Sequence, residues 1–144
     1  MTQVGIITNI LQKGPLMHDS KTNEEIIETF KTFENDKLSL ILSTTSLNNE
    51  PLTNYSPFVT LEGKYFICIS SQLPHYKNIV QTKKAHVLII EDEAKASNIY
   101  ARKRLYFSVD CQLFENNTED IFNLFDKRYG ESLSFLRNMK DFKI

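Results

Sequence analysis

The feature that most constrains this fold is a series of short β-rich runs joined by tight turns. The runs 37–45 and 52–61 are separated by the polar turn SLNNEP, and Glu62 and Gly63 turn the chain into a third run at 64–70. Connections this short join neighbouring antiparallel strands, because a parallel pair needs a crossover of about a dozen residues. The sequence therefore predicts an antiparallel meander.

Two later runs extend the predicted sheet. The run 85–91 is apolar enough for a buried strand, and the run 104–114 alternates strictly between apolar and polar residues. Alternate side chains of a strand point to opposite faces, so one set of this run belongs to the core. That core set comprises Leu105, Phe107, Val109, Cys111 and Leu113.

Helices are predicted on either side of these strands. Thr22 and Glu25 have the spacing of a capping box, and apolar residues follow them at helical intervals. Further helices are expected at 74–82, which starts with proline, at 119–129 and at 132–140.

These elements predict an α+β fold, a small antiparallel split β-barrel of about six strands with peripheral helices. The 144 residues are 41% hydrophobic, which is enough for one substantial core, and no repeat or linker divides them. We therefore expect a single domain over residues 1–144, with an irregular N-terminal arm at 1–20.

Composition excludes several classes of protein. A net charge of −1 argues against a general nucleic-acid or membrane-surface binder, and no apolar run is long enough to span a membrane. Cys68 and Cys111 lack metal-ligand spacing, so free thiols in a reducing compartment, the cytoplasm, are expected. The signatures GxGxxG, P-loop and HExxH are missing from the sequence.

Four segments carry a family resemblance: NYSPFV (54–59), ISSQLPHYKNI (69–79), IIEDEAKASNIYARKRL (89–105) and DF (141–142). Over roughly residues 37–142 the chain resembles haem-utilisation proteins of the HugZ/HutZ type, in the pyridoxamine 5'-phosphate oxidase-like split-barrel superfamily. The resemblance implies a homodimer that binds a flat cofactor between its subunits. That cofactor is haem in this branch and FMN in much of the wider superfamily.

Arg102 and Arg104 are the first candidates for cofactor binding. They lie two residues apart on an extended segment, so both are expected opposite the core face that holds Leu105. Paired guanidiniums suit a haem propionate or the FMN phosphate, and the resemblance places Arg104 on the distal side of a haem. The alternative is a salt-bridge network with the acids at 91–93.

His75 and Asn78 match a family pair at the start of a helix, where an imidazole can donate to an anion. The alternative for His75 is a capping or surface residue. Tyr55 and Ser56 are predicted to line the pocket wall, with core packing as the alternative for Tyr55. His86 is expected to be a hydrogen-bonded strand residue in preference to a ligand.

The resemblance also shows where the chain differs from these relatives. Relatives continue past the DF segment with a strand and a glycine-rich tail whose histidine binds the haem iron, and Asp141 matches the carboxylate that pairs with that histidine. Without a counterpart of that histidine, His18 is the remaining candidate iron ligand.

Three functions stay open, and with them the question of enzymatic activity. The first is a haem-binding protein of haem-iron utilisation, with oxygen-dependent haem degradation as the associated activity. The second is an FMN-binding flavoprotein oxidoreductase, and the third is a cofactor-free dimeric barrel.

Overall fold

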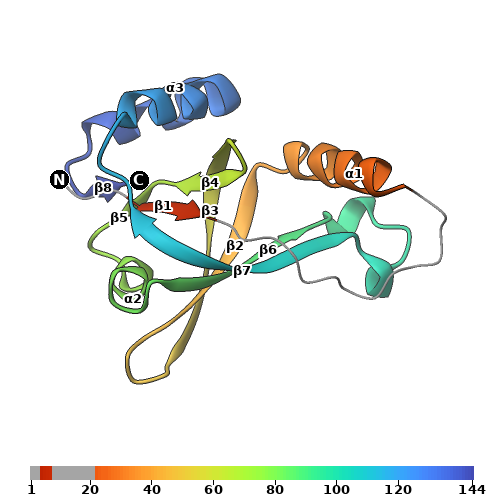
Figure 1. Cartoon of the computed structure of the whole chain (residues 1–144), viewed down its shortest axis with the longest axis horizontal. Coiled ribbons are helices and arrows are strands. Elements are labelled where there is room, and N and C mark those ends of the chain that lie inside the picture. Colours follow the sequence, from red (N-terminus) through yellow and green to blue (C-terminus); the bar gives the residue numbers. More distant parts are fainter. Residues whose placement is uncertain (1–3, 8–21) are drawn as a thin grey trace.

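A computed structural model describes residues 4–7 and 22–144, and six of its strands close into an antiparallel barrel (Figure 1). The barrel strands are β1 (Val4–Ile7), β2 (Ser39–Thr45), β3 (Pro51–Leu61), β4 (Lys64–Ile67), β6 (Lys84–Ile90) and β7 (Arg104–Leu113). The remaining elements are α1 (Asn23–Asn35), β5 (Ile69–Ser70), α2 (Pro74–Thr82), η1 (Glu93–Lys95), η2 (Ile99–Ala101), α3 (Thr118–Tyr129), η3 (Gly130–Asn138) and β8 (Phe142–Lys143).

The strand order around the barrel is β1-β4-β3-β2-β6-β7, and β1 pairs with both β4 and β7 to close it. Every pair is antiparallel. The predicted meander is confirmed, since β2, β3 and β4 follow one another in sequence and in space. The α+β barrel predicted from the sequence is therefore the observed architecture.

The prediction of an irregular arm over residues 1–20 is wrong for Val4–Ile7. This segment forms β1, in which Ile6 is the register partner of Tyr65 on one side and of Cys111 on the other. Four residues are too few to display a strand period, and their hydrogen bonds come from strands far away in sequence. The rest of the predicted arm lies outside the described residues.

The buried hydrophobic side chains form two separate cores. The first fills the barrel, and the predicted alternation of β7 is confirmed because Phe107, Val109 and Cys111 point into it. The second lies between the barrel and the C-terminal elements and comprises Val59, Phe66, Cys68, Ile121, Phe125, Leu136 and Ile144.

Two predicted elements differ in detail. The run 64–70 splits at Cys68, because β5 leaves the barrel and pairs with β8 in a separate two-stranded sheet. The helix expected at 132–140 is the 3₁₀ helix η3, which begins at Gly130. Helix 74–82 is confirmed at both ends.

Helix α1 has the predicted capping box, with Thr22 and Glu25 satisfying each other's backbone N–H groups. However, none of its residues is buried, and Ile27 and Phe30 are exposed. Figure 1 shows the helix standing beside the barrel and not across it.

Both cysteines are buried free thiols, and burial raises the pKa of each to about 12. They are therefore protonated at neutral pH. Within the described part of the chain, no helix is long and apolar enough to cross a membrane.

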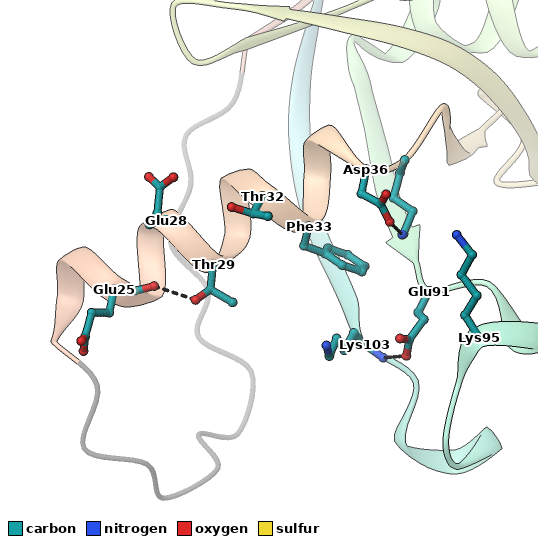
Figure 2. A pocket seen from close by; sticks show the side chains of 10 residues that line it. Glu25, Glu28, Thr29, Thr32, Phe33, Asp36, Glu91, Lys95 and Lys103 are labelled. Atoms are coloured by element: carbon teal, nitrogen blue, oxygen red, sulfur yellow. Dashed lines mark hydrogen bonds and ion pairs between the residues drawn. The ribbon is translucent and has the colours of Figure 1, made fainter.

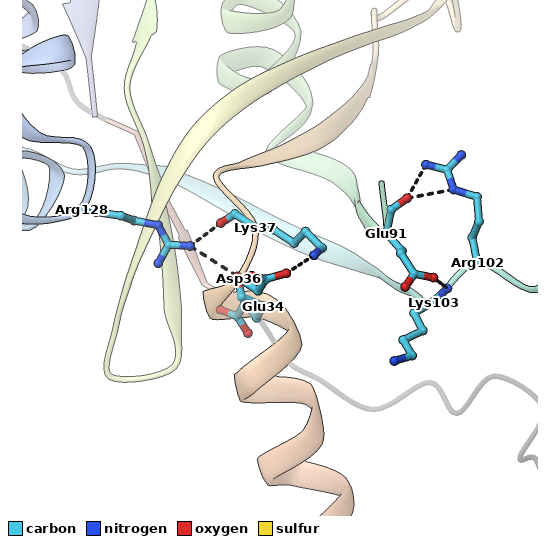
Figure 3. A network of polar contacts seen from close by, with 7 residues as sticks. All are labelled: Glu34, Asp36, Lys37, Glu91, Arg102, Lys103 and Arg128. Carbon is cyan, nitrogen blue, oxygen red and sulfur yellow. Dashed lines mark hydrogen bonds and ion pairs between the residues drawn. The ribbon is translucent and has the colours of Figure 1, made fainter. Parts of the chain in front are cut away.

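The end of α3 fastens α1 and β3 to each other. Arg128 donates through Nη2 to the carbonyl of Glu34 in the last turn of α1, at 3.3 Å, and to that of Lys37 just after the helix, at 2.5 Å (Figure 3). The Tyr129 hydroxyl accepts from the Phe58 N–H at 2.9 Å and lies 2.6 Å from the Phe58 carbonyl. One residue pair thus satisfies backbone groups from two distant elements.

We expect Tyr129→Phe to lower the free energy of unfolding by about 1–3 kcal/mol, because the Phe58 N–H and carbonyl lose their partner in a water-poor site. Urea unfolding measures this change. The control is Tyr100→Phe, since Tyr100 is 93% exposed and should tolerate the loss of its hydroxyl. Equal stability of the two variants would contradict the role given to Tyr129.

Candidate functional site

An apolar row crosses the outside of four barrel strands. Tyr55, Ile41, Leu88 and Tyr106 are successive register partners on β3, β2, β6 and β7. Their neighbours along each strand point into the core, so these four side chains point outward. Tyr55 and Tyr106 are 71% and 44% exposed, which leaves aromatic surface open at both ends of the row.

Polar and charged groups flank this row. On one side His86 shares a hydrogen bond of 3.2 Å with the Ser108 hydroxyl, and its ring lies 6.0 Å from that of Tyr106. On the other side Arg104 is the register partner of Ile90, two residues before Tyr106 on the same face. We call the apolar row with His86 and Arg104 the outer sheet face. It combines apolar surface, aromatic rings and a guanidinium.

Arg104 and Arg102 differ in their surroundings. Arg104 is exposed, and within the described part of the chain its guanidinium makes one long contact, 3.5 Å, to the Arg102 carbonyl. Arg102 instead turns back to donate through Nε (2.8 Å) and Nη2 to the Glu91 carbonyl (Figure 3). Its guanidinium therefore holds the β6–β7 loop together.

The acids of this loop pair only in part with the arginines. The Glu91 carboxylate accepts from the Lys103 N–H at 3.1 Å, and Glu93 lies 3.9 Å from Arg102. The predicted salt-bridge network is thus limited to the Arg102–Glu93 pair. Because Glu93 is largely exposed, this pair contributes little to stability.

His75 and Asn78 lie on α2, away from the outer sheet face, and both are buried. His75 Nδ1 lies 3.0 Å from the side-chain nitrogen of Asn54 on β3. Asn78 donates to the Thr44 hydroxyl on β2 at 3.1 Å. These two bonds tie α2 to adjacent strands of the β2–β3 hairpin.

Tyr55 and Ser56 point to opposite faces of β3. Ser56 is buried, and its hydroxyl donates to the Pro57 carbonyl at 2.9 Å, whereas Tyr55 belongs to the outer sheet face. Sequence reasoning gave Tyr106 no role, although a large aromatic in the polar set of an alternating strand was a usable signal. Asn54 had no such signal, because its partner is 21 residues away.

A separate pocket of about 690 Å³ lies between α1 and the β6–β7 loop (Figure 2). Its charged groups partly pair with one another: Asp36 with the Lys37 ammonium at 2.6 Å, and the Glu91 carboxylate with the Lys103 N–H. Among the described residues, none of the predicted site residues lines it. The pocket is therefore distinct from the cofactor site predicted at Arg104, Arg102, His75, Asn78, Tyr55 and Ser56.

Of the two residues that the sequence linked to iron ligation, Asp141 and His18, the structure describes only Asp141. Asp141 accepts from the Ser70 hydroxyl at 2.7 Å, and its carbonyl accepts from the Ser71 N–H at 2.7 Å. Asp141 thereby secures the β5–β8 sheet. His18 lies outside the described residues, among which no cluster of three or more metal-binding side chains occurs.

Comparisons with known proteins show which family the chain belongs to. The chain is 30% identical over 117 residues to the haem oxygenase HutZ of Vibrio cholerae. It matches the crystal structure of HutZ, described there as a haem storage protein, with a TM-score of 0.74 over 80% of this chain and 83% of that one. The chain belongs to the HutZ/ChuZ family of haem-utilisation proteins. No family model matches the chain.

Two further solved structures show the extent of the match. Campylobacter jejuni ChuZ is 29% identical with a TM-score of 0.77, over 85% of this chain and 52% of ChuZ. A haem-binding protein of Mycobacterium smegmatis, at 16% identity and a TM-score of 0.68, shares the fold. The chain spans 66% of the length of HutZ.

Burial lowers the pKa of His75 from its ordinary value of 6.5, because the charged imidazolium is poorly solvated. The unfolded chain therefore binds a proton near pH 6.5, whereas the folded chain binds it only at lower pH. We expect the free energy of unfolding to decrease as pH falls below about 6.5, and His75→Gln to reduce that decrease. Urea unfolding between pH 5 and 8 measures both. Identical pH profiles would contradict the assignment to His75.

Proposed function

We propose that this protein binds haem for haem utilisation, at the outer sheet face and between two copies of the chain. The observation that carries the proposal is the exposed Arg104 beside Tyr106, on a face whose other members are mostly apolar. A haem has the same two parts, an apolar macrocycle and anionic propionates. Membership of the HutZ/ChuZ family supports this choice of cofactor.

The residues of the outer sheet face fit such a cofactor. Arg104 would bind a propionate, because its guanidinium stays charged and offers paired donors. Tyr55 and Tyr106 would pack against the macrocycle. Haem supplies, when bound, a redox-active iron that can react with oxygen.

The other predicted residues receive supporting roles in the proposal. Arg102 would hold the loop from which Arg104 emerges, through its bonds to the Glu91 carbonyl. His75 and Asn78 would keep α2 against the hairpin that carries Tyr55. Ser56 would stabilise the strand that carries Tyr55 from its core side, through the bond of its hydroxyl to the Pro57 carbonyl.

A homodimer is part of the proposal because the apolar row suits a second copy. The row has exposed tyrosines at its ends, Tyr55 and Tyr106, and half-buried Ile41 and Leu88 between them, and a symmetric partner would cover it with the same residues. A cofactor held between the two copies would be shielded from water on both faces. We place the dimer in the cytoplasm, a reducing compartment that suits its two free thiols.

Leu88→Glu should convert the dimer to a monomer, because two carboxylates would be buried at the centre of the interface. Sedimentation equilibrium of the mutant and wild type measures the mass. Gln112→Glu is the matched control, since Gln112 is an exposed residue farther along β7. A wild-type monomer at every concentration would exclude the proposed dimer.

Arg104→Ala should weaken haem binding by roughly ten- to a hundredfold, the effect of losing one charge-assisted bond of about 1.5–3 kcal/mol. Titrating the protein with ferric haem and following the Soret band measures the affinity. Lys84→Ala is the control, because this cation already pairs with Asp110 at 2.5 Å and should not affect binding.

Parallel spectra separate the three functions that the sequence left open. A Soret band on haem addition supports the proposal, whereas flavin bands on FMN addition would replace haem by FMN. The absence of both signals would indicate a cofactor-free barrel. Equal haem affinity of the wild type and Arg104→Ala would remove Arg104 from the site.

A further inference from the structure

The buried contact between Asn54 and His75 determines which imidazole nitrogen carries the proton. We infer that Asn54 is a positioning residue that holds His75 in its neutral Nε2–H form. In that form Nε2 is a hydrogen-bond donor and has no lone pair for a metal. The contacts that set this tautomer lie within the protein and need no bound ligand.

The orientation of the Asn54 amide follows from its second contact. The Tyr55 N–H donates to Asn54 Oδ1 at 2.8 Å, so the oxygen faces the backbone. The amide nitrogen is then the atom that faces His75 Nδ1, at 3.0 Å. If the amide were reversed, its NH₂ group would face the Tyr55 N–H. Both groups are donors, so that hydrogen bond would be lost.

An amide nitrogen can only donate, so His75 Nδ1 must accept. In a neutral imidazole the other nitrogen, Nε2, then carries the hydrogen. Protonating Nδ1 would bring two donors together in a site where the side chain is 3% exposed and water cannot separate them. The bond to Asn54 and burial therefore favour the same neutral form.

This tautomer limits what His75 can do for a cofactor, and here the inference rests on the proposed function. A histidine that ligates a metal commonly donates its second N–H to a carboxylate or carbonyl. His75 has the opposite arrangement, because its second nitrogen accepts. Buried on α2 and away from the outer sheet face, His75 would therefore leave the iron of a bound haem to another ligand.

Asn54→Asp tests the tautomer with a nearly isosteric change. The carboxylate can still accept from the Tyr55 N–H, but its other oxygen can only accept from His75, which requires hydrogen on Nδ1. ¹⁵N NMR of histidine-labelled protein without any ligand reads the protonation of each ring nitrogen. His75→Gln assigns the signals.

We expect Nε2–H in the wild type and Nδ1–H, as the neutral or doubly protonated ring, in Asn54→Asp. The control Asn78→Asp adds the same charge to the same helix–hairpin contact without touching the imidazole, so its His75 should match the wild type. Nδ1–H in the wild type, or an unchanged tautomer in Asn54→Asp, would overturn the inference.

Because the NMR experiment contains no ligand, failure of the wild type to bind haem would refute the proposed function and leave the tautomer of His75 standing.

Discussion

The site depends on the register between β2 and β3. Ile41 opposite Tyr55 and Leu42 opposite Asn54 place the tyrosine outside the barrel and the asparagine inside. A shift of one residue would exchange these faces, removing Tyr55 from the apolar row and Asn54 from His75. Burial of Phe58 in the barrel core opposes such a shift, because its ring would then have to face water. Core packing thus fixes the positions of both polar and aromatic groups.

The barrel and the C-terminal elements stabilise each other through shared strands. On β3, Phe58 packs inside the barrel, whereas its neighbour Val59 packs against the core formed with α3 and η3. The Tyr129 hydroxyl then binds the backbone of Phe58 itself. Within η3, Arg137 donates to Asp126 at 2.6 Å and holds this segment on α3. Strand β3, which carries Tyr55 of the outer sheet face, is therefore supported from both sides.

The two arginines illustrate how similar residues acquire different roles. Arg102 precedes β7, where the chain is still turning, so its guanidinium can reach the Glu91 carbonyl across the loop. Arg104 is the first residue of β7, and the strand pairing with Ile90 directs it outward. Their spacing predicted a common face, but the loop ends between them. The single-chain structure leaves Arg104 as the more accessible cation for an anionic ligand.

The sequence by itself determined the local elements: the alternation of β7, the capping box of α1 and the proline-initiated α2 each depend on residues a few positions apart. The family resemblance also identified candidate residues in four segments. Only the tertiary structure decided that Val4–Ile7 closes the barrel and that Asp141 binds Ser70. The same holds for the contact between Asn54 and His75. These interactions join residues 21 to more than 70 positions apart, and no local pattern encodes them.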